Sequence, residues 1–377
     1  MNTCRICQEQ LNHPDYLTPS PAITSLATSL DVPTAVSVCR ACGHVQSPDL
    51  PNVQAFYDHD YRISLQSDDH DQLYAIEPEG PVFRTTHQAK LLLSLDMPQG
   101  SKVMDFGAGK ATTLRLLLDH RPDLKPYVFD ISDDYRAHWA DWVPKGAQAT
   151  YKIPKAWAEK FDLITAHFVL EHVTDPVAVL TTLRQCLAPG GRLFFTVPDP
   201  ISNPGDLLVV DHLNHFVPAS IARALTLAGL KEELNRQDFF AGAHVVVSSS
   251  GNQESNLPPN SQTVLAALDD WKALLSRVED QVLAAGNGPI AIYGAGFYAA
   301  LFSTQINVRA ICFLDQNPYL QGGTLNGLPV IAPEKCPKET KILLVALNPT
   351  RARKIFSETQ LWLPDGVRVL YPEVISK

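Results

Sequence analysis

The sequence contains no run of about 18 consecutive apolar residues, so it offers no candidate for a membrane-spanning helix. No apolar stretch follows a basic start at the N-terminus, and a signal peptide is therefore not expected. Basic residues are in the minority, with 31 Lys and Arg against 40 Asp and Glu and a formal net charge of −9. An acidic chain gains little from counterion release on a nucleic-acid backbone, so we expect neither a membrane nor a nucleic-acid partner.

Cysteine is scarce, and seven residues in a chain of 377 are too few for a disulfide scaffold. Four of them form two tight pairs, Cys4-x-x-Cys7 and Cys39-x-x-Cys42, with 31 residues between the pairs. A two-residue gap lets both thiolates of a pair face one tetrahedral ion, and two pairs complete a closed shell. We therefore expect a structural zinc ion held by these four thiolates, in a soluble cytoplasmic protein. The alternative is four unrelated buried thiols.

Apolar residues make up 45% of the chain and charged residues 19%, as in packed globular domains. Residues 1–70 have only short apolar runs, and a metal ion would stabilise such a small module. From about residue 85, segments typical of strands alternate with segments typical of helices, which predicts a doubly wound α/β sheet that is mostly parallel. The polar segment 251–262 is a candidate linker. The expected domains are residues 1–70, 71–250 and 251–377, the last of them Rossmann-like.

Periodicity also gives the expected elements. The expected strands are residues 102–106, 127–130, 161–165, 192–197 and 289–293, and the expected helices include residues 88–93 and 264–282.

A glycine loop, Asp105-Phe106-Gly107-Ala108-Gly109, connects the first of these strands to a helix. The two glycines let the backbone approach a ligand closely. Asp130 follows Gly109 by 21 residues and ends the next strand, where a carboxylate can bind a ribose diol. A dinucleotide site favours Gly or Ala where this chain has Thr112. The other ligand suited to such a loop is S-adenosylmethionine (SAM), which carries no phosphate.

The loop resembles the first motif of class I SAM methyltransferases, in which Asp105, Gly107, Gly109 and Asp130 match position by position. Segments 161–176 and 187–193 resemble the fourth-strand region and the turn into the fifth strand of the same enzymes. The resemblance implies a class I methyltransferase fold and a SAM site made of Asp105, Gly107, Ala108, Gly109, Asp130, Ile131 and His167. In the same region, we expect Glu171 and His172 to be structural or to lie at the edge of the cofactor.

A second glycine loop, residues 294–299, fits the Gly-x-Gly-x-x-Ala pattern better than the first, and Asp315 follows Gly296 by 19 residues. The pattern is typical of a nicotinamide site, but a Rossmann-like half used only as a scaffold explains it equally well. An NAD-dependent oxidoreductase of nucleotide sugars is therefore one alternative function.

The order of a four-cysteine segment, a SAM domain and a Rossmann-like domain resembles the nucleotide-sugar C-methyltransferases, bacterial enzymes that methylate a ring carbon of deoxysugars. Segments 38–46, 56–64, 315–323 and 327–330 carry the detailed resemblance. It implies a small-molecule acceptor, a nucleotide-linked ketosugar, that is methylated through an enolate.

Carbon methylation beside a ketone requires a base and a group that holds the enolate. In the family, a carboxylate–histidine pair follows the fifth strand, and segment 211–216 of this chain occupies that place. The resemblance implies His212 as the base, Asp211 as its orienting partner, Tyr61 beside the oxyanion and His215 as a further catalytic candidate. The family usually has a glutamate and a tyrosine where this chain has Asp211 and Val209. Methylation of oxygen or nitrogen on another small molecule therefore stays an alternative.

Overall fold

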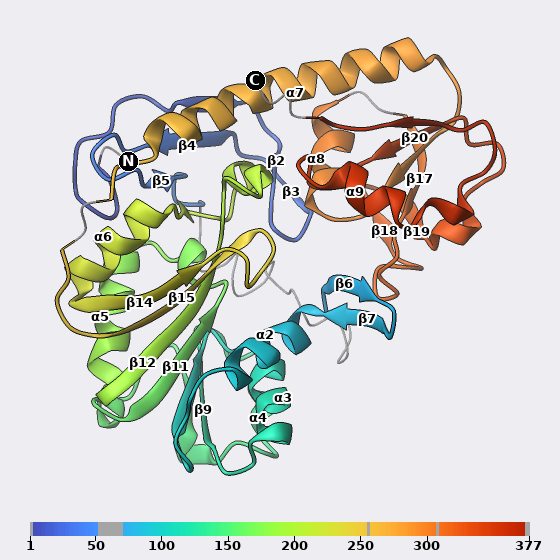
Figure 1. The fold of residues 1–377 in the computed structure, drawn as a ribbon. Coiled ribbons are helices and arrows are strands. Elements are labelled where there is room, and N and C mark those ends of the chain that lie inside the picture. Colours follow the sequence, from blue (N-terminus) through green and yellow to red (C-terminus); the bar gives the residue numbers. More distant parts are fainter. Residues whose placement is uncertain (1–2, 52–70, 255–256, 307–308, 374–377) are drawn as a thin grey trace.

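The computed structural model describes residues 3–51, 71–254, 257–306 and 309–373 (Figure 1). Its largest sheet has seven strands in the order β10-β9-β8-β11-β12-β15-β14. These strands are β8 (Lys102–Phe106), β9 (Lys125–Asp130), β10 (Gln148–Thr150), β11 (Phe161–His167), β12 (Leu187–Pro198), β14 (Leu230–Arg236) and β15 (Ala243–Ser250). The first five pair in parallel, and β15 lies antiparallel between β12 and β14. The predicted α/β sheet is confirmed.

Successive residues of the central strands pack into two separate cores, because side chains alternate between the faces of a sheet. Val103, Leu163 and Phe194 face one core, and their neighbours Met104, Ile164 and Phe195 face the other. The first core is covered by α2 (Arg84–Leu93), α3 (Thr112–His120) and α4 (Arg136–Trp139). The second is covered by α5 (Pro176–Cys186) and α6 (Pro218–Ala228), on the opposite side of the sheet in Figure 1.

The ends of the helices follow from local sequence. α5 begins with Pro176, and the side chain of Asp175 accepts a hydrogen bond from the backbone N–H of Ala178 (2.9 Å). α6 begins with Pro218 and ends at Ala228, and the following Gly229 has a φ of 72°, the left-handed conformation that favours glycine. Gly229 therefore turns the chain from α6 directly into β14.

The N-terminal residues form a sheet with the order β1-β4-β5-β13. Its strands are β1 (Tyr16–Thr18), β4 (Thr34–Val38), β5 (Val45–Gln46) and β13 (Asn214–His215), with the hairpin of β2 (Ala22–Ile23) and β3 (Ser29–Leu30) alongside. β13 comes from the middle of the chain and pairs antiparallel with β5. The hydrogen-bonded ladder therefore joins residues on both sides of the expected boundary at residue 70.

The C-terminal residues form a second sheet, with the order β18-β19-β17-β16-β20-β21. Its strands are β16 (Ile290–Tyr293), β17 (Ala310–Leu314), β18 (Thr324–Leu325), β19 (Leu328–Ile331), β20 (Ile342–Val345) and β21 (Arg368–Leu370), and its helices are α8 (Phe297–Gln305) and α9 (Ala352–Ser357). All described neighbours pair in parallel except β18 with β19. This arrangement agrees with the predicted Rossmann-like unit.

The 25-residue helix α7 (Ser261–Ala285) lies across the N-terminal and C-terminal sheets (Figure 1). Its buried stripe includes Val264, Leu268 and Trp271, and it shares one hydrophobic core with both sheets. Among the described helices, none is long and apolar enough to cross a membrane.

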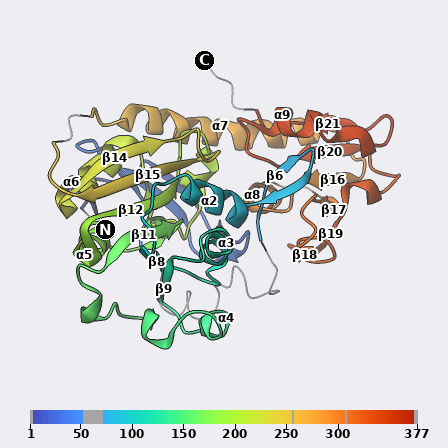
Figure 2. The same cartoon turned by 60° about the horizontal axis from the view of Figure 1, so that its bottom comes forward.

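The hairpin of β6 (Leu73–Glu77) and β7 (Gly80–Phe83) leads into α2 and reaches the C-terminal domain (Figures 1 and 2). The ring of Phe83 lies 5.4 Å from that of Tyr319, and Asn317 Nδ2 donates a hydrogen bond to the carbonyl oxygen of Asp71 (3.3 Å). These contacts join the segment before α2 to the chain that follows β17.

Candidate functional site

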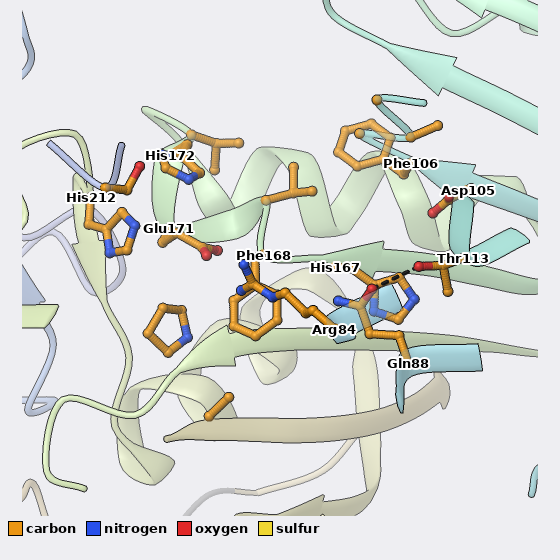
Figure 3. Close-up of a pocket in the computed structure, with 18 of the residues that line it drawn as sticks. Arg84, Gln88, Asp105, Phe106, Thr113, His167, Phe168, Glu171, His172 and His212 are labelled. Atoms are coloured by element: carbon orange, nitrogen blue, oxygen red, sulfur yellow. Dashed lines mark hydrogen bonds between the residues drawn. The ribbon is translucent and has the colours of Figure 1, made fainter. Parts of the chain in front are cut away.

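A cavity of about 1150 Å³ lies at the carboxyl ends of β8, β9 and β11. The strand order reverses between β8 and β11, which is the switch point where open α/β sheets bind ligands. Strand β6 and helix α2 contribute to one wall, and the turn η5 (Pro204–Leu208) and Tyr298 of α8 contribute to another. Figure 3 shows residues that line the cavity, among them Arg84 and Gln88 of α2, Asp105 of β8 and His167 of β11.

All seven residues expected to bind the cofactor line this cavity: Asp105, Gly107, Ala108, Gly109, Asp130, Ile131 and His167. They come from three separate strand ends, so the fold brings together what the sequence predicted as one site. Their individual roles remain predictions.

The two acidic residues of this set are held in different ways. Asp105 ends β8 with its neighbour Phe106 and accepts a hydrogen bond from Thr165 Oγ1 (2.8 Å), and burial raises its pKa to about 7. Asp130 accepts hydrogen bonds from the backbone N–H groups of Gly109 (2.8 Å) and Ser132 (3.0 Å), while burial raises its pKa as well. Each carboxylate oxygen has two lone pairs, so Asp130 can still accept hydrogen bonds from ribose hydroxyls.

Gly107 is a position that only glycine fits. Its φ is 71°, and a Cβ placed on it would lie 2.5 Å from Cγ2 of Val169. The backbone N–H groups of Gly107 and Ala108 both donate to the carbonyl oxygen of Phe129. The loop is therefore tied to β9 with its bare backbone beside the cavity.

His167 ends β11 with an imidazole that has no hydrogen-bond partner for either ring nitrogen in the described part of the chain. Burial lowers its pKa to about 3, so the ring is neutral. In Figure 3 it lies near Gln88 and Thr113, which are hydrogen-bonded to each other (2.7 Å). A buried polar group usually has a partner, and a neutral imidazole at this wall can give one hydrogen bond to a ligand and accept another.

His212 and His215 share the carboxylate of Asp206, which lies on η5. Nδ1 of His212 donates to Oδ1 of Asp206 (2.5 Å), and Nδ1 of His215 donates to Oδ2 (2.9 Å). Nε2 of His215 lies 3.1 Å from Oγ of Ser47, so both of its ring nitrogens are engaged. The cavity lining includes Asp206 and His212 but not His215. This geometry leaves His212 alone of the two imidazoles able to reach a ligand.

The charges of this cluster reinforce one another. Burial alone would lower the pKa of His212, but the charge and hydrogen bond of Asp206 outweigh burial and raise it to about 9. Burial alone would raise the pKa of Asp206, but the two imidazoles hold it well below its usual range. An ionised Asp206 therefore stabilises the protonated form of His212.

The prediction that Asp211 orients His212 is wrong. The carboxylate of Asp211 accepts hydrogen bonds from the backbone N–H and the hydroxyl of Ser25, both at 2.7 Å. Neighbouring side chains on non-helical backbone point in different directions, so Asp211 faces the N-terminal segment while His212 faces Asp206. Sequence reasoning missed Asp206, because nothing local to it shows that η5 turns it back toward a histidine six residues later.

The turn η5 is itself held by residues of the C-terminal part of the chain. The backbone N–H of Gly205 donates to the hydroxyl of Tyr298 (3.2 Å), which donates to Oδ1 of Asn203 (2.5 Å). Nε1 of Trp271 donates to the carbonyl oxygen of Pro204 (2.7 Å). The C-terminal domain and α7 therefore position the carboxylate that holds His212.

Glu171 and His172 lie on the turn η4 (Leu170–His172), and both line the cavity. Glu171 is buried, and its Oε2 has no hydrogen-bond partner among the residues that the structure describes. Burial raises its pKa to about 8 and lowers that of His172 to about 4. Tyr61, the residue expected beside the oxyanion, lies outside the described residues.

The four cysteines of the two pairs come together in the N-terminal module. Their sulfur atoms, in Cys4, Cys7, Cys39 and Cys42, all lie within 4.8 Å of one another. Between the pairs, the sulfur of Cys4 lies 3.6 Å from that of Cys42, and the sulfur of Cys7 lies 3.5 Å from that of Cys39. A tetrahedral zinc site with Zn–S distances of about 2.3 Å has S–S edges of about 3.8 Å. The donor set and its dimensions therefore fit zinc.

Arg5 links this cysteine cluster to the histidine segment. Its guanidinium donates to the carbonyl oxygens of Ser47 (2.8 Å) and Leu213, and its backbone N–H donates to Oε1 of Gln46 (2.8 Å). Ser47 in turn contacts His215. Direct contacts therefore connect the N-terminal module to the segment that carries His212.

The second glycine loop repeats the geometry of the first. Asp315 accepts hydrogen bonds from the backbone N–H groups of Ala295 (2.7 Å) and Asn317 (2.8 Å), as Asp130 does in the other domain. Phe297 and Tyr298, the residues of this loop that begin α8, line the cavity described above. Whether this loop holds a nucleotide stays a prediction.

Residues 82–233 match a family model described as a methyltransferase domain. The chain is 30% identical over 126 residues to trans-aconitate 2-methyltransferase of Variovorax paradoxus (strain S110), covering 32% of this chain and 48% of that protein. It is 28% identical over 155 residues to ubiquinone biosynthesis O-methyltransferase of Xanthomonas axonopodis pv. citri (strain 306), covering 36% and 65%. A crystal structure of a SAM-dependent methyltransferase from Mesorhizobium loti is similar with a TM-score of 0.35 and 18% identity, covering 42% of this chain and 95% of that one.

The chain spans about half to two thirds of the length of these curated relatives. The family match and the order of the sheet identify residues 82–233 as a class I SAM-dependent methyltransferase domain. The expected fold class is confirmed. The cysteine pairs and the C-terminal sheet lie outside the matched residues.

Proposed function

We propose that the protein transfers the methyl group of SAM to a ring carbon of a nucleotide-linked ketosugar. The observation that carries the proposal is that the glycine loop of the methyltransferase domain and a buried imidazole–carboxylate pair line one cavity. A methyl donor on the loop and an acceptor beside His212 would share this space, which extends to the C-terminal domain through Tyr298.

Bound SAM would supply an electrophilic methyl group on a sulfonium. The residues that would hold it are those of the first loop and of the neighbouring strand ends. Asp130 would accept hydrogen bonds from the ribose hydroxyls, and Ile131 would lie beside the adenine ring. Gly107 supports the fit, because it leaves bare backbone at the cavity wall, where a Cβ would collide with Val169. Neutral His167 would hydrogen-bond the ligand at the end of β11.

Replacing Gly107 by alanine is expected to weaken SAM binding at least about tenfold, measured by isothermal titration. A non-glycine residue in the left-handed region costs about 1–2 kcal/mol, and the new Cβ would collide with Val169. Gly146→Ala is the matched control, because Gly146 has neither a positive φ nor a heavy atom within 4 Å of a new Cβ. An unchanged dissociation constant for Gly107→Ala would place the ligand elsewhere.

His212 is the proposed base. Its Nε2 would take the proton from the carbon next to the ketone, while Asp206 holds Nδ1 and stabilises the imidazolium that forms. His212 acts as a base in its neutral form, and the fraction of enzyme molecules with a neutral His212 grows as the pH rises toward the pKa of about 9. His215 contacts Asp206 and Ser47 and is proposed as a positioning residue.

Oxygen methylation is the second candidate. It is favoured by the similarity to an enzyme whose name specifies an O-methyltransferase, at 28% identity. The same base would then take the proton of a hydroxyl group, and no enolate would form. The two reactions differ in one observable, because only carbon methylation labilises the hydrogen on the acceptor carbon.

The discriminating experiment is transfer of a labelled methyl group from SAM to a panel of nucleotide-4-ketosugars, with the product atom located by NMR. We expect a new C–CH3 group and, in deuterated water, exchange of the α-hydrogen that depends on the enzyme. Label appearing on oxygen without α-exchange would favour the second candidate. No transfer to any ketosugar by protein that binds SAM would contradict the proposal.

We also propose that the four thiolates bind one structural zinc ion, because their number and spacing fit a closed tetrahedral shell. Free thiolates persist in reducing compartments, which supports a cytoplasmic location.

A further inference from the structure

We propose that Glu171 is a second catalytic residue, a neutral carboxylic acid that donates a hydrogen bond to the carbonyl oxygen of the acceptor as the enolate forms. The inference rests on the proposed carbon methylation and names the group that holds the enolate. The sequence resemblance implied Tyr61 for this task and gave Glu171 only a structural or cofactor-edge position.

Glu171 lies at the wall of the cavity. It follows β11 directly, on η4, and its side chain is buried at the wall of the cavity. In Figure 3 its carboxyl group lies between His212 and Phe168 and points into the space between them. Oε2 has no hydrogen-bond partner among the described residues, although buried polar atoms normally have one. A substrate oxygen would supply the missing partner.

Glu171 also lies close to His212, the proposed base. The ligand atoms of Glu171, His172 and His212 all lie within 4.8 Å of one another. In a ketone, the acidic hydrogen and the carbonyl oxygen sit on adjacent carbons. One acceptor can therefore present its hydrogen to His212 and its oxygen to Glu171 at the same time.

The surroundings of Glu171 favour the uncharged form of its carboxyl group. The charged and titratable groups that act on Glu171 are His212, Asp206 of η5 and Arg84 of α2, with His172 next to it on its own turn. Burial raises the pKa of Glu171 to about 8, against the lowering effect of His212 and Arg84. The carboxyl group is therefore protonated at pH 7 and can donate a hydrogen bond, whereas a carboxylate would repel an enolate.

The step balances without a further reactant. The proton on the acceptor carbon moves to Nε2 of His212, and the C–H electron pair forms the enolate double bond while the oxygen gains negative charge. That oxygen accepts the hydrogen bond from Glu171. The enolate carbon then attacks the sulfonium methyl group, the S–CH3 bond breaks with its electron pair going to sulfur, and the carbonyl group re-forms with the proton still on Glu171.

The experiment compares Glu171→Ala, Glu171→Gln and the exposed control Glu339→Gln in the zinc-loaded full chain. Glu171→Ala is expected to lower kcat about 100- to 1000-fold, the usual effect of removing one oxyanion donor, with the dissociation constant for SAM unchanged. Glu171→Gln keeps an N–H donor and is expected to stay within about tenfold of the wild-type kcat.

The pH profile separates catalysis from structure. In the wild type, kcat/KM should rise as His212 deprotonates and fall as Glu171 ionises, which gives a narrow maximum between pH 8 and pH 9. Glu171→Gln should lose the alkaline fall and reach a plateau. An infrared difference spectrum of wild type against Glu171→Gln, which needs no acceptor, should show a protonated carboxyl band at pH 7.

Several results would overturn the inference. They are a wild-type kcat in Glu171→Ala, an alkaline fall that persists in Glu171→Gln, or an ionised Glu171 at pH 7. Glu171, His172 and His212 also offer a donor set for a divalent cation. A requirement for added Mg²⁺ or Mn²⁺ would show that a metal ion holds the enolate, and it would overturn the inference as well. A wild-type protein that binds SAM but methylates no ketosugar overturns both the proposed function and this inference, whereas an active wild type with an unimpaired Glu171→Ala overturns the inference alone.

Discussion

Replacing His212 by alanine is expected to lower kcat by about 10²- to 10⁴-fold, the usual contribution of a general base, while the affinity for SAM stays unchanged. The imidazole is the one histidine of the Asp206 pair that lines the cavity, and the loop that would hold SAM is formed by other residues. Single-turnover methyl transfer measures the first quantity, and isothermal titration the second.

The matched control is His120→Ala, because His120 is an exposed histidine on α3 whose Nδ1 contacts only its own helix through Leu116. His212→Ala with unimpaired turnover would eliminate His212 as the base. Loss of SAM binding in the same variant would instead show that the residue supports the fold of the cavity.

Asp206→Asn tests the corrected partner of His212. The ionised carboxylate outweighs burial and raises the pKa of His212, so its removal should move the acidic limb of the pH profile to lower pH. The rate should rise at lower pH than in the wild type, with a reduced maximum because the amide no longer stabilises the imidazolium. An acidic limb that stays in place would mean that another group sets it.

Replacing Cys39 by serine is expected to remove zinc and to unfold the N-terminal module. Structural zinc contributes about 10–16 kcal/mol of apparent binding free energy, which is comparable to the whole stability of a typical domain, about 5–15 kcal/mol. Elemental analysis should show about one zinc per chain in the wild type and almost none in the variant, together with a large fall in Tm or in solubility.

The same variant should lose methyl transfer. The cysteine module meets the histidine segment through Arg5, Ser47 and the pairing of β5 with β13, so its unfolding should displace His212. Cys336→Ser is the control, because Cys336 is a half-buried cysteine of the C-terminal domain outside the cluster. A wild-type protein that is fully folded without metal would contradict the zinc assignment.

Local patterns predicted most of the α/β framework. The strand expected at residues 102–106 is β8 (Lys102–Phe106), and the helix expected at residues 264–282 lies within α7 (Ser261–Ala285). These elements have strong periodicity or end at glycine and proline, so their sequence specifies them. β15 was not foreseen, because its antiparallel place between β12 and β14 depends on contacts that only the folded sheet provides.

The candidate site divides in the same way. The glycine loop and Asp130 could be predicted, because one motif and one strand end place them at the same edge of a parallel sheet. The carboxylate that holds His212 could not, because Asp206 reaches it through a turn that the C-terminal domain stabilises. The family resemblance implied Asp211, whose side chain instead contacts Ser25.

A bound SAM molecule in the cavity at the end of β8 is the premise of the proposed methyl transfer. Isothermal titration of the zinc-loaded protein with SAM, run beside Asp130→Ala, tests this point. The account predicts one SAM bound per chain and a loss of at least about 1.4 kcal/mol, tenfold in affinity, in the variant. A folded wild-type protein that gives no binding heat with millimolar SAM, or an Asp130→Ala variant that binds as tightly as the wild type, would contradict it.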